Sequence, residues 1–193
     1  MIADNDLFRL AGLAAWLALA AFVISAIALA LFFGGAGQVF GPINDAFIAI
    51  ALVALVPAVL AVDRLARAEL APWVRVLSIA AIVGIVIAAC GQMLLIVGGI
   101  TLDQSYVTGG VGILPVLAWI VLVAMLGLGP HVLPAEVGWL AVAVMAAIVV
   151  SSLVAIVTTG PVLWIATVGL VIVVSAWMGG LAVAVGSRAG VTT

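Results

Sequence analysis

Long stretches without a single charged residue dominate the pattern of apolar and polar positions along this chain. A helix needs about 20 consecutive apolar residues to cross the hydrocarbon core of a bilayer, so such runs count membrane crossings directly. The breaks between the runs contain Gly, Pro or charged residues, which are typical of loops. The pattern predicts an all-α, polytopic membrane helical bundle that forms a single integral membrane domain over residues 1–193. Its six expected transmembrane helices are residues 10–33, 46–62, 76–100, 111–129, 137–157 and 161–186.

The first apolar run raises the alternative of a secretory signal peptide. Its apolar stretch is about twice as long as the usual hydrophobic region of such a peptide, and no convincing cleavage site follows it. We therefore expect a retained transmembrane helix. A transmembrane β-barrel would need short segments of alternating polarity, whereas these runs are apolar on every face.

The arginines predict the orientation, because Lys and Arg are retained in cytoplasmic loops. With six crossings and a cytoplasmic N-terminus, all five basic residues fall on the cytoplasmic side, which predicts that both termini are cytoplasmic. These residues are Arg9, Arg64, Arg67, Arg75 and Arg188. The chain has no Lys and is rich in Ala and Val, which indicates a GC-rich genome, and we expect the plasma (inner) membrane of a bacterium.

Composition supports a lipid environment for most of the outer surface. Apolar residues make up 69% of the chain and charged residues only 6%, against roughly half and a quarter in soluble domains. So few charged side chains cannot supply a polar exterior in water. The formal net charge of -2 also argues against a nucleic-acid partner, which would require the neutralisation of several phosphates.

Catalytic chemistry finds little support in the residue inventory. Cys90 and His131 are the only cysteine and the only histidine, so one chain cannot form a disulfide, a zinc cluster or a haem site with two histidine ligands. The serines within the apolar runs have no intramembrane His or Lys to serve as base. We therefore expect neither an enzyme nor a bound metal or cofactor.

Small residues mark one face of the third expected helix. Ala80, Gly84, Ala88 and Gln92 recur every four residues and share that face. The simpler interpretation is a packing seam in which Gln92 forms a hydrogen bond to a neighbouring helix. The alternative places Gln92 and Cys90 in a ligand pocket in the outer half of the bilayer.

Most other polar residues gather at the expected outer surface. Because no Arg lies on that side, Asp45 and Asp103 would give this surface a mildly negative potential that attracts a cation or an amine. The simpler role expected here is structural, since Asn44 or Asp45 is placed to cap the first turn of the second helix. The candidate ligand-binding residues are Asn44, Asp45, Cys90, Gln92, Asp103, Gln104 and Tyr106.

Tryptophans occur at two depths in the expected bundle. Trp73, Trp139 and Trp164 lie at helix ends, where aromatic residues anchor a protein at the membrane interface. Trp119 and Trp177 lie deep within their helices, and we expect them to pack internally. Weak internal similarity, with Trp16 aligned to Trp139, leaves three stacked hairpins and two inverted halves open as architectures.

These patterns do not identify a specific function. The leading hypothesis is a small-molecule carrier, permease or ligand-binding membrane protein whose entrance is the polar outer surface. The competing hypothesis is a non-catalytic assembly or interaction subunit of a membrane complex, and a membrane enzyme ranks third. The expected partners are the lipid bilayer, a small neutral or cationic molecule, and other membrane proteins or further copies of this chain.

Overall fold

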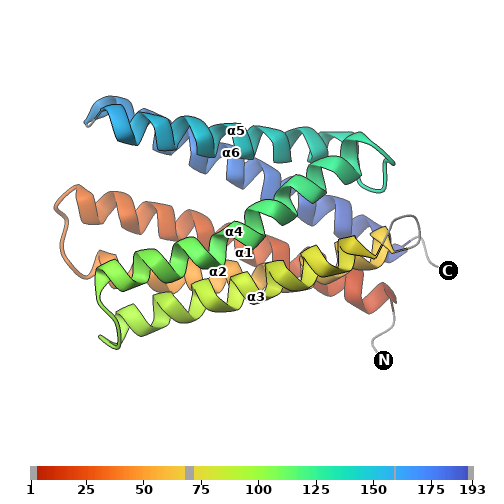
Figure 1. The fold of residues 1–193 in the computed structure, drawn as a ribbon, viewed down its shortest axis with the longest axis horizontal. Coiled ribbons are helices and arrows are strands. Elements are labelled where there is room, and N and C mark those ends of the chain that lie inside the picture. The colour runs from red at the N-terminus through yellow and green to blue at the C-terminus, as the bar shows by residue number, and fades with distance from the viewer. Residues whose placement is uncertain (1–3, 68–71, 159, 191–193) are drawn as a thin grey trace.

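Six long helices make up the protein in a computed structural model that describes residues 4–67, 72–158 and 160–190 (Figure 1). All six are long and apolar enough to cross a membrane, and the described residues form no strands. The prediction of an all-α, multi-pass membrane protein is confirmed. The helices are α1 (Asp4–Phe33), α2 (Phe40–Ala66), α3 (Trp73–Ile96), α4 (Leu102–Leu128), α5 (Ala135–Val157) and α6 (Pro161–Gly186), followed by a short 3-10 helix, η1 (Ser187–Gly190).

The helices form a closed ring in which each packs on the next and α6 returns to pack on α1. α1 starts and η1 ends at the same end of the bundle (Figure 1). At that end, Arg64 Nε lies 3.1 Å from Asp4 Oδ1, and Arg188 donates a hydrogen bond of 3.0 Å to the carbonyl of Val132. All five arginines lie near helix ends on this side, which we call the arginine end. We call the opposite end the cleft end.

Three helices begin at least six residues earlier than their apolar runs predict, and the first of them is α1, which starts at Asp4 and not at residue 10. α2 starts at Phe40, not at residue 46, and its first turn includes Pro42, where the missing N–H is tolerated. α4 starts at Leu102, not at residue 111, so the expected loop over residues 101–110 is wrong. Thr101 and Gln104 form a capping box there, with hydrogen bonds of 3.3 Å and 2.9 Å between each side chain and the other residue's backbone N–H.

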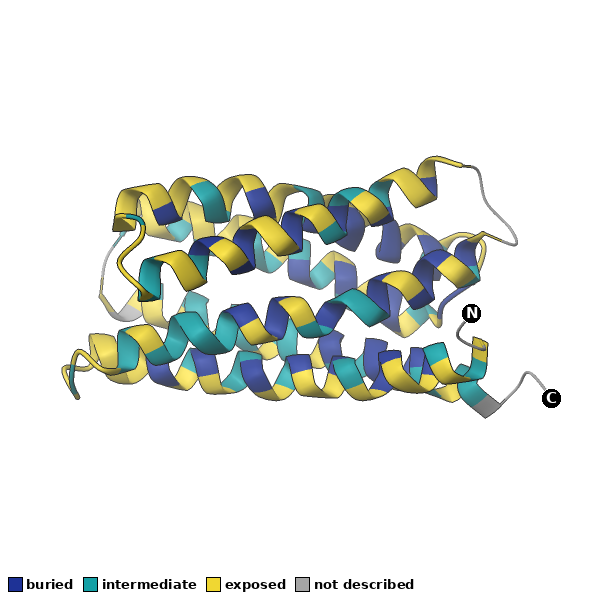
Figure 2. Ribbon diagram, turned by 90° about the horizontal axis from the view of Figure 1, so that it is seen from below, coloured by how far each residue is buried: buried dark blue, intermediate teal, exposed yellow. Residues whose placement is uncertain are grey.

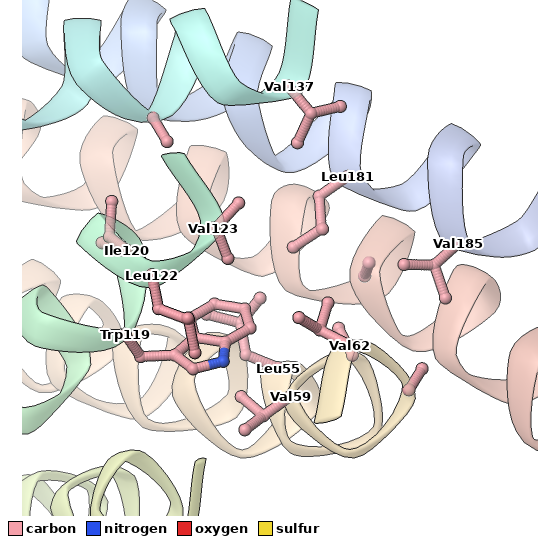
Figure 3. Packing of buried hydrophobic residues seen from close by; sticks show 14 of the residues in the cluster. Leu55, Val59, Val62, Trp119, Ile120, Leu122, Val123, Val137, Leu181 and Val185 are labelled. Atoms are coloured by element: carbon pink, nitrogen blue, oxygen red, sulfur yellow. The ribbon is translucent and has the colours of Figure 1, made fainter. Parts of the chain in front are cut away.

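A continuous apolar core runs through the middle of the bundle towards the arginine end (Figure 3). Trp119 and Trp177 are both buried and pack edge to face, with ring centroids 6.1 Å apart. Such aromatic pairs stabilise a core beyond their area burial by about 1 kcal/mol. The prediction that these two tryptophans pack internally is confirmed.

Glycine pairs bring three neighbouring pairs of helices into close contact. A Cβ atom at Gly84 would lie 2.3 Å from the carbonyl oxygen of Gly112, so α3 and α4 touch through their backbones. The predicted seam of small residues on α3 is therefore confirmed. Gly127 packs on Gly138 between α4 and α5, and Gly12 packs on Gly186 between α1 and α6. The last two pairs lie near the arginine end.

α5 and α6 are much less enclosed at the cleft end than at the arginine end. In the bundle as a whole, buried positions are densest in the half that holds both termini (Figure 2). The buried residues of this hairpin stop at Val144 on α5 and resume at Trp177 on α6. Among the described residues between them, none is buried. Trp164 nevertheless contacts Phe33 on α1, with ring centroids 6.3 Å apart. The hairpin is thus held to the bundle mainly at the arginine end.

Candidate ligand cleft

A cleft of about 490 Å³ opens between α1, α2, α3 and α4 at the cleft end. Its wall combines polar groups from α2, α3 and α4 with apolar side chains from α1. The lining residues are Leu29, Phe32, Phe33, Gly41, Asn44, Asp45, Gln92, Leu95, Leu102, Ser105, Tyr106, Gly109 and Gly110.

A chain of hydrogen bonds fixes the polar wall on α2. The hydroxyl of Ser25, on α1, donates to Asn44 Oδ1 over 2.7 Å, and Asn44 Nδ2 donates to Asp45 Oδ1 over 3.0 Å. Ser25 is buried, so this bond ties α1 to α2 away from the bulk solvent. The amide of Asn44 thereby orients the carboxylate of Asp45 at the cleft wall.

The expected role of Asn44 or Asp45 as a helix cap is wrong. α2 already starts at Phe40, so both residues lie beyond its first turn. The N-cap residue is Val39, which makes no side-chain capping bond. Asn44 and Asp45 therefore point their polar groups at α1 and the cleft instead of at the free backbone donors of the helix start.

Gln92 brings α3 into the cleft wall. Its Oε1 is buried, and no donor among the described residues bonds to it. Gly91 permits the close approach, because a Cβ atom there would lie 2.5 Å from the hydroxyl of Thr108 on α4. The hydrogen bond across the seam that the simpler interpretation assigned to Gln92 is not formed between described groups. Because that oxygen is also shielded from solvent, Gln92 would have to turn its amide towards the cleft to accept a hydrogen bond from a ligand.

Not all predicted site residues meet at the cleft. Asn44, Asp45, Gln92 and Tyr106 line it, with Tyr106 at the rim and 70% exposed. Cys90 lies on the exposed side of α3. Asp103 is exposed in the first turn of α4, and Gln104 is committed to the capping box.

Two polar residues of this region were not among the predicted site residues. Ser105 is 5% exposed and lines the cleft, and Ser25, on α1, holds Asn44 in the cleft wall by a hydrogen bond. Ser105 and Asp103 are two positions apart, so they lie on opposite sides of α4. Their spacing is the only feature of the sequence that distinguishes the side of Ser105 from that of Asp103. No local pattern pairs Ser25 with Asn44, because the two residues come from different helices.

The cleft end carries negative charge without a basic partner. Within the described residues, its charged side chains are Asp45 and Asp103, while all the arginines lie at the arginine end. A concave site with one sign of charge and low-dielectric walls concentrates ions of the opposite sign. The potential at this cleft therefore favours cations over anions.

An apolar chamber of about 200 Å³ lies among α1, α2, α4, α5 and α6. Every residue that lines it is apolar or aromatic. They are Phe22, Ile48, Ala51, Leu52, Leu55, Ile113, Val116, Leu117, Ile120, Val144, Ile148, Leu170, Val174, Trp177 and Met178.

The cleft presents polar side chains that can form hydrogen bonds, and the chamber presents only apolar walls. In residues 4–67, 72–158 and 160–190, no three His, Cys, Asp or Glu side chains gather as metal ligands would. No protein-family model matches the chain, and neither a curated protein nor a solved structure shows significant similarity to it.

Proposed function

We propose that this multi-pass membrane protein binds a small molecule in the cleft and acts as a carrier or permease for it. The observation that carries the proposal is the convergence of Asn44, Asp45 and Gln92 on one cleft from two different helices. Polar side chains are costly at membrane depth, so a cluster of them facing a cavity marks a candidate pathway or binding site. A ligand in the cleft would supply the missing donor to Oε1 of Gln92 once that amide turns towards it.

The two ends of the bundle fit a carrier that is open to one side. The cleft opens at one end, while close glycine contacts and buried apolar residues close the arginine end. A carrier exposes its site to one side of the membrane at a time by moving one group of helices against another. The α5–α6 hairpin, with no buried residue in the described stretch from 145 to 176, is the candidate moving part.

The charge at the cleft restricts the ligand to neutral or cationic molecules. Asp45 lines the cleft, whereas Asp103 is exposed beside it and acts only at longer range. Contact between a carboxylate and a cation includes charge-assisted hydrogen bonds, which contribute about 1.5–3 kcal/mol. Asp45 is therefore expected to contribute much more to affinity than Asp103.

Substitution of the two acids tests this function. We expect Asp45→Asn to weaken binding of ethylammonium at least tenfold, and Asp103→Asn to weaken it less than threefold. Asp45→Asn retains an oxygen that can accept from Asn44, so the fold should be retained. Equilibrium dialysis with protein in lipid nanodiscs measures the affinity, and thermal unfolding checks the fold. Equal affinity in the two variants and the wild type would show that ethylammonium does not bind in the cleft, which would contradict the proposed function.

One observation favours the competing role of an assembly subunit. The cleft-end halves of α5 and α6 leave large apolar side chains such as Ile156 and Ile165 more than 70% exposed. Another membrane protein could cover these side chains in place of lipid. Co-purification of a stoichiometric partner in native lipid particles, together with loss of that partner on Ile165→Ser, would support this role over the carrier.

A further inference from the structure

The cleft and the apolar chamber follow one another along the same faces of two helices. Chamber residues continue the cleft-lining positions at intervals of three or four residues, the spacing that keeps side chains on one helix face. On α2 the series is Gly41, Asn44, Asp45, Ile48, Ala51, Leu52 and Leu55. On α4 it is Tyr106, Gly109, Gly110, Ile113, Val116, Leu117 and Ile120.

The change from polar to apolar along these faces is abrupt. Asp45 is the last charged residue in the α2 series, and Ile48 lies one turn deeper. The bond between Ser25 and Asn44 marks the boundary on the α1 side. A ligand that occupied both spaces would need a polar group at one end and an apolar body at the other.

The size of the chamber sets the scale of that body. An apolar cavity of about 150 Å³ in a protein core stays free of water and binds benzene. The chamber here has about 200 Å³ and is partly open to its surroundings, so it has room for an aromatic ring or a short alkyl chain. Its apolar lining offers nothing to hold water in place, which favours an apolar occupant.

The chemistry of the cleft selects the polar group. Asp45 supplies a carboxylate, and Oε1 of Gln92 is a buried acceptor without a donor among the described residues. Both are acceptors, so the complementary group is a hydrogen-bond donor with positive charge. A primary or secondary ammonium group combines these two properties, whereas a quaternary ammonium lacks an N–H donor.

We propose that the cleft and the chamber together bind an amphipathic amine. Its ammonium group contacts Asp45 and Gln92, and its apolar body extends past Ile48 into the chamber. This inference rests on the proposed function of the cleft and adds the chemical class of the ligand. It implies that the charge of the head group and the length of the apolar body each change the affinity independently of the other.

A series of n-alkylamines from ethylamine to decylamine, with the alcohols of equal length, tests the proposal. The full chain is placed in lipid nanodiscs, binding to empty nanodiscs is subtracted, and affinity is referred to the free aqueous concentration. We expect affinity to rise about fourfold per methylene, the value for removal of CH₂ from water, and to level off when the chamber is full. Each alcohol should bind at least tenfold more weakly than its amine.

Two variants on α2 separate the chamber from the lipid surface. Ala51→Phe places a ring in the chamber wall, so the rise in affinity should stop at a shorter chain. Val53→Phe, on the same helix but 54% exposed, is the matched control and should bind like the wild type. Leu117→Ala enlarges the chamber and should extend the rise to longer chains, which keeps the test valid if Ala51→Phe fails to fold.

The outcomes distinguish this inference from the proposed function. Binding of ethylamine without dependence on chain length would overturn the amphipathic ligand and leave the cleft as a site for small cations. Equal affinities of amines and alcohols would overturn the assignment of the ammonium group to Asp45. A chain-length limit that is the same in the wild type, Ala51→Phe and Leu117→Ala would place the apolar body outside the chamber. Binding of ethylamine together with no binding of the longer amines would contradict the amphipathic amine and keep the proposed function. Absence of binding by every member of the series, ethylamine included, would contradict the function itself.

Discussion

The helices pack closely at the arginine end of the bundle and loosely at the cleft end. At the arginine end, Gly12 meets Gly186 and Gly127 meets Gly138 at backbone contact, and the bundle also buries apolar side chains there, among them Val62, Leu126 and Val185. At the cleft end, α5 and α6 bury no described side chain between residues 145 and 176, and a cleft of about 490 Å³ separates the other helices. One end is closed by close contacts, and the other is left open.

If the proposed function holds, this difference separates the part of the molecule that stabilises the bundle from the part that binds a ligand. Lipid tails are as apolar as Leu, so helices in a bilayer associate through close packing and not through the hydrophobic effect. The glycine contacts at the arginine end supply that packing. Asn44, Asp45 and Gln92 instead face a space at the cleft end that their own bundle does not fill. Substitutions at the cleft end are therefore expected to change the free energy of unfolding little and to change ligand affinity strongly.

Sidedness is the prediction with an all-or-none result. In a Cys90→Ser background, a cysteine at Gln38 or Asp103, at the cleft end, should react completely with a membrane-impermeant maleimide in intact cells. A cysteine at Glu136 or Ser187, at the arginine end, should react only after permeabilisation, because arginine-rich loops stay in the cytoplasm. The reverse pattern would invert the orientation without changing the bundle.

The largest effect on stability is expected at the contact between α3 and α4. Gly84→Leu would drive a side chain into the carbonyl of Gly112, since even a Cβ atom would lie 2.3 Å from that oxygen. We expect a loss of at least about 3 kcal/mol, the upper range for overpacked sites. Val83→Leu, at the neighbouring position and 51% exposed, is the control and should be nearly neutral. Unfolding in mixed detergent micelles measures both, and equal stability would contradict a backbone contact here.

The number and type of helices were accessible from the sequence, while several of their boundaries were not, the starts of α1, α2 and α4 above all. Uncharged runs of about 20 residues rarely form anything other than membrane helices. Counting such runs locates only the apolar part of each helix. Residues 40–45 and 102–110 are helical although they contain polar groups, because helices extend beyond the hydrocarbon core. The capping box at Thr101 and Gln104 was the local signal for the second of these extensions.

Four of the seven predicted site residues line the cleft, and one feature of helices explains why the others do not. The sequence placed polar residues at the correct end of the bundle without fixing the face of the helix on which each one lies. Cys90 and Gln92 are two positions apart, which is about 200° around a helix, so only one of them can face the cleft. Gln92 does, and Cys90 is exposed on the other side. The contact of Ser25 with Asn44 depends on how α1 packs on α2, which no pattern within one helix encodes.

The smallest predicted effect compares one alanine at each end of the bundle. Gly127→Ala would place a Cβ atom 2.7 Å from the Cα of Gly138 at the arginine end, so α4 and α5 must separate. We expect a loss of about 2 kcal/mol. Gly169→Ala, on the open half of α6, meets nothing within 4 Å. This variant should gain about 0.5 kcal/mol, because alanine reduces the conformational freedom of the unfolded chain.

The same unfolding experiment in mixed micelles measures both alanine variants against the wild type. Opposite signs would establish that the arginine end is closed by backbone contacts and that the cleft-end half of α6 faces only lipid. A loss of stability in Gly169→Ala as large as that in Gly127→Ala would mean that another helix covers α6 in the membrane. That helix would have to come from a second copy or another protein, and the assembly role would then be favoured over the carrier.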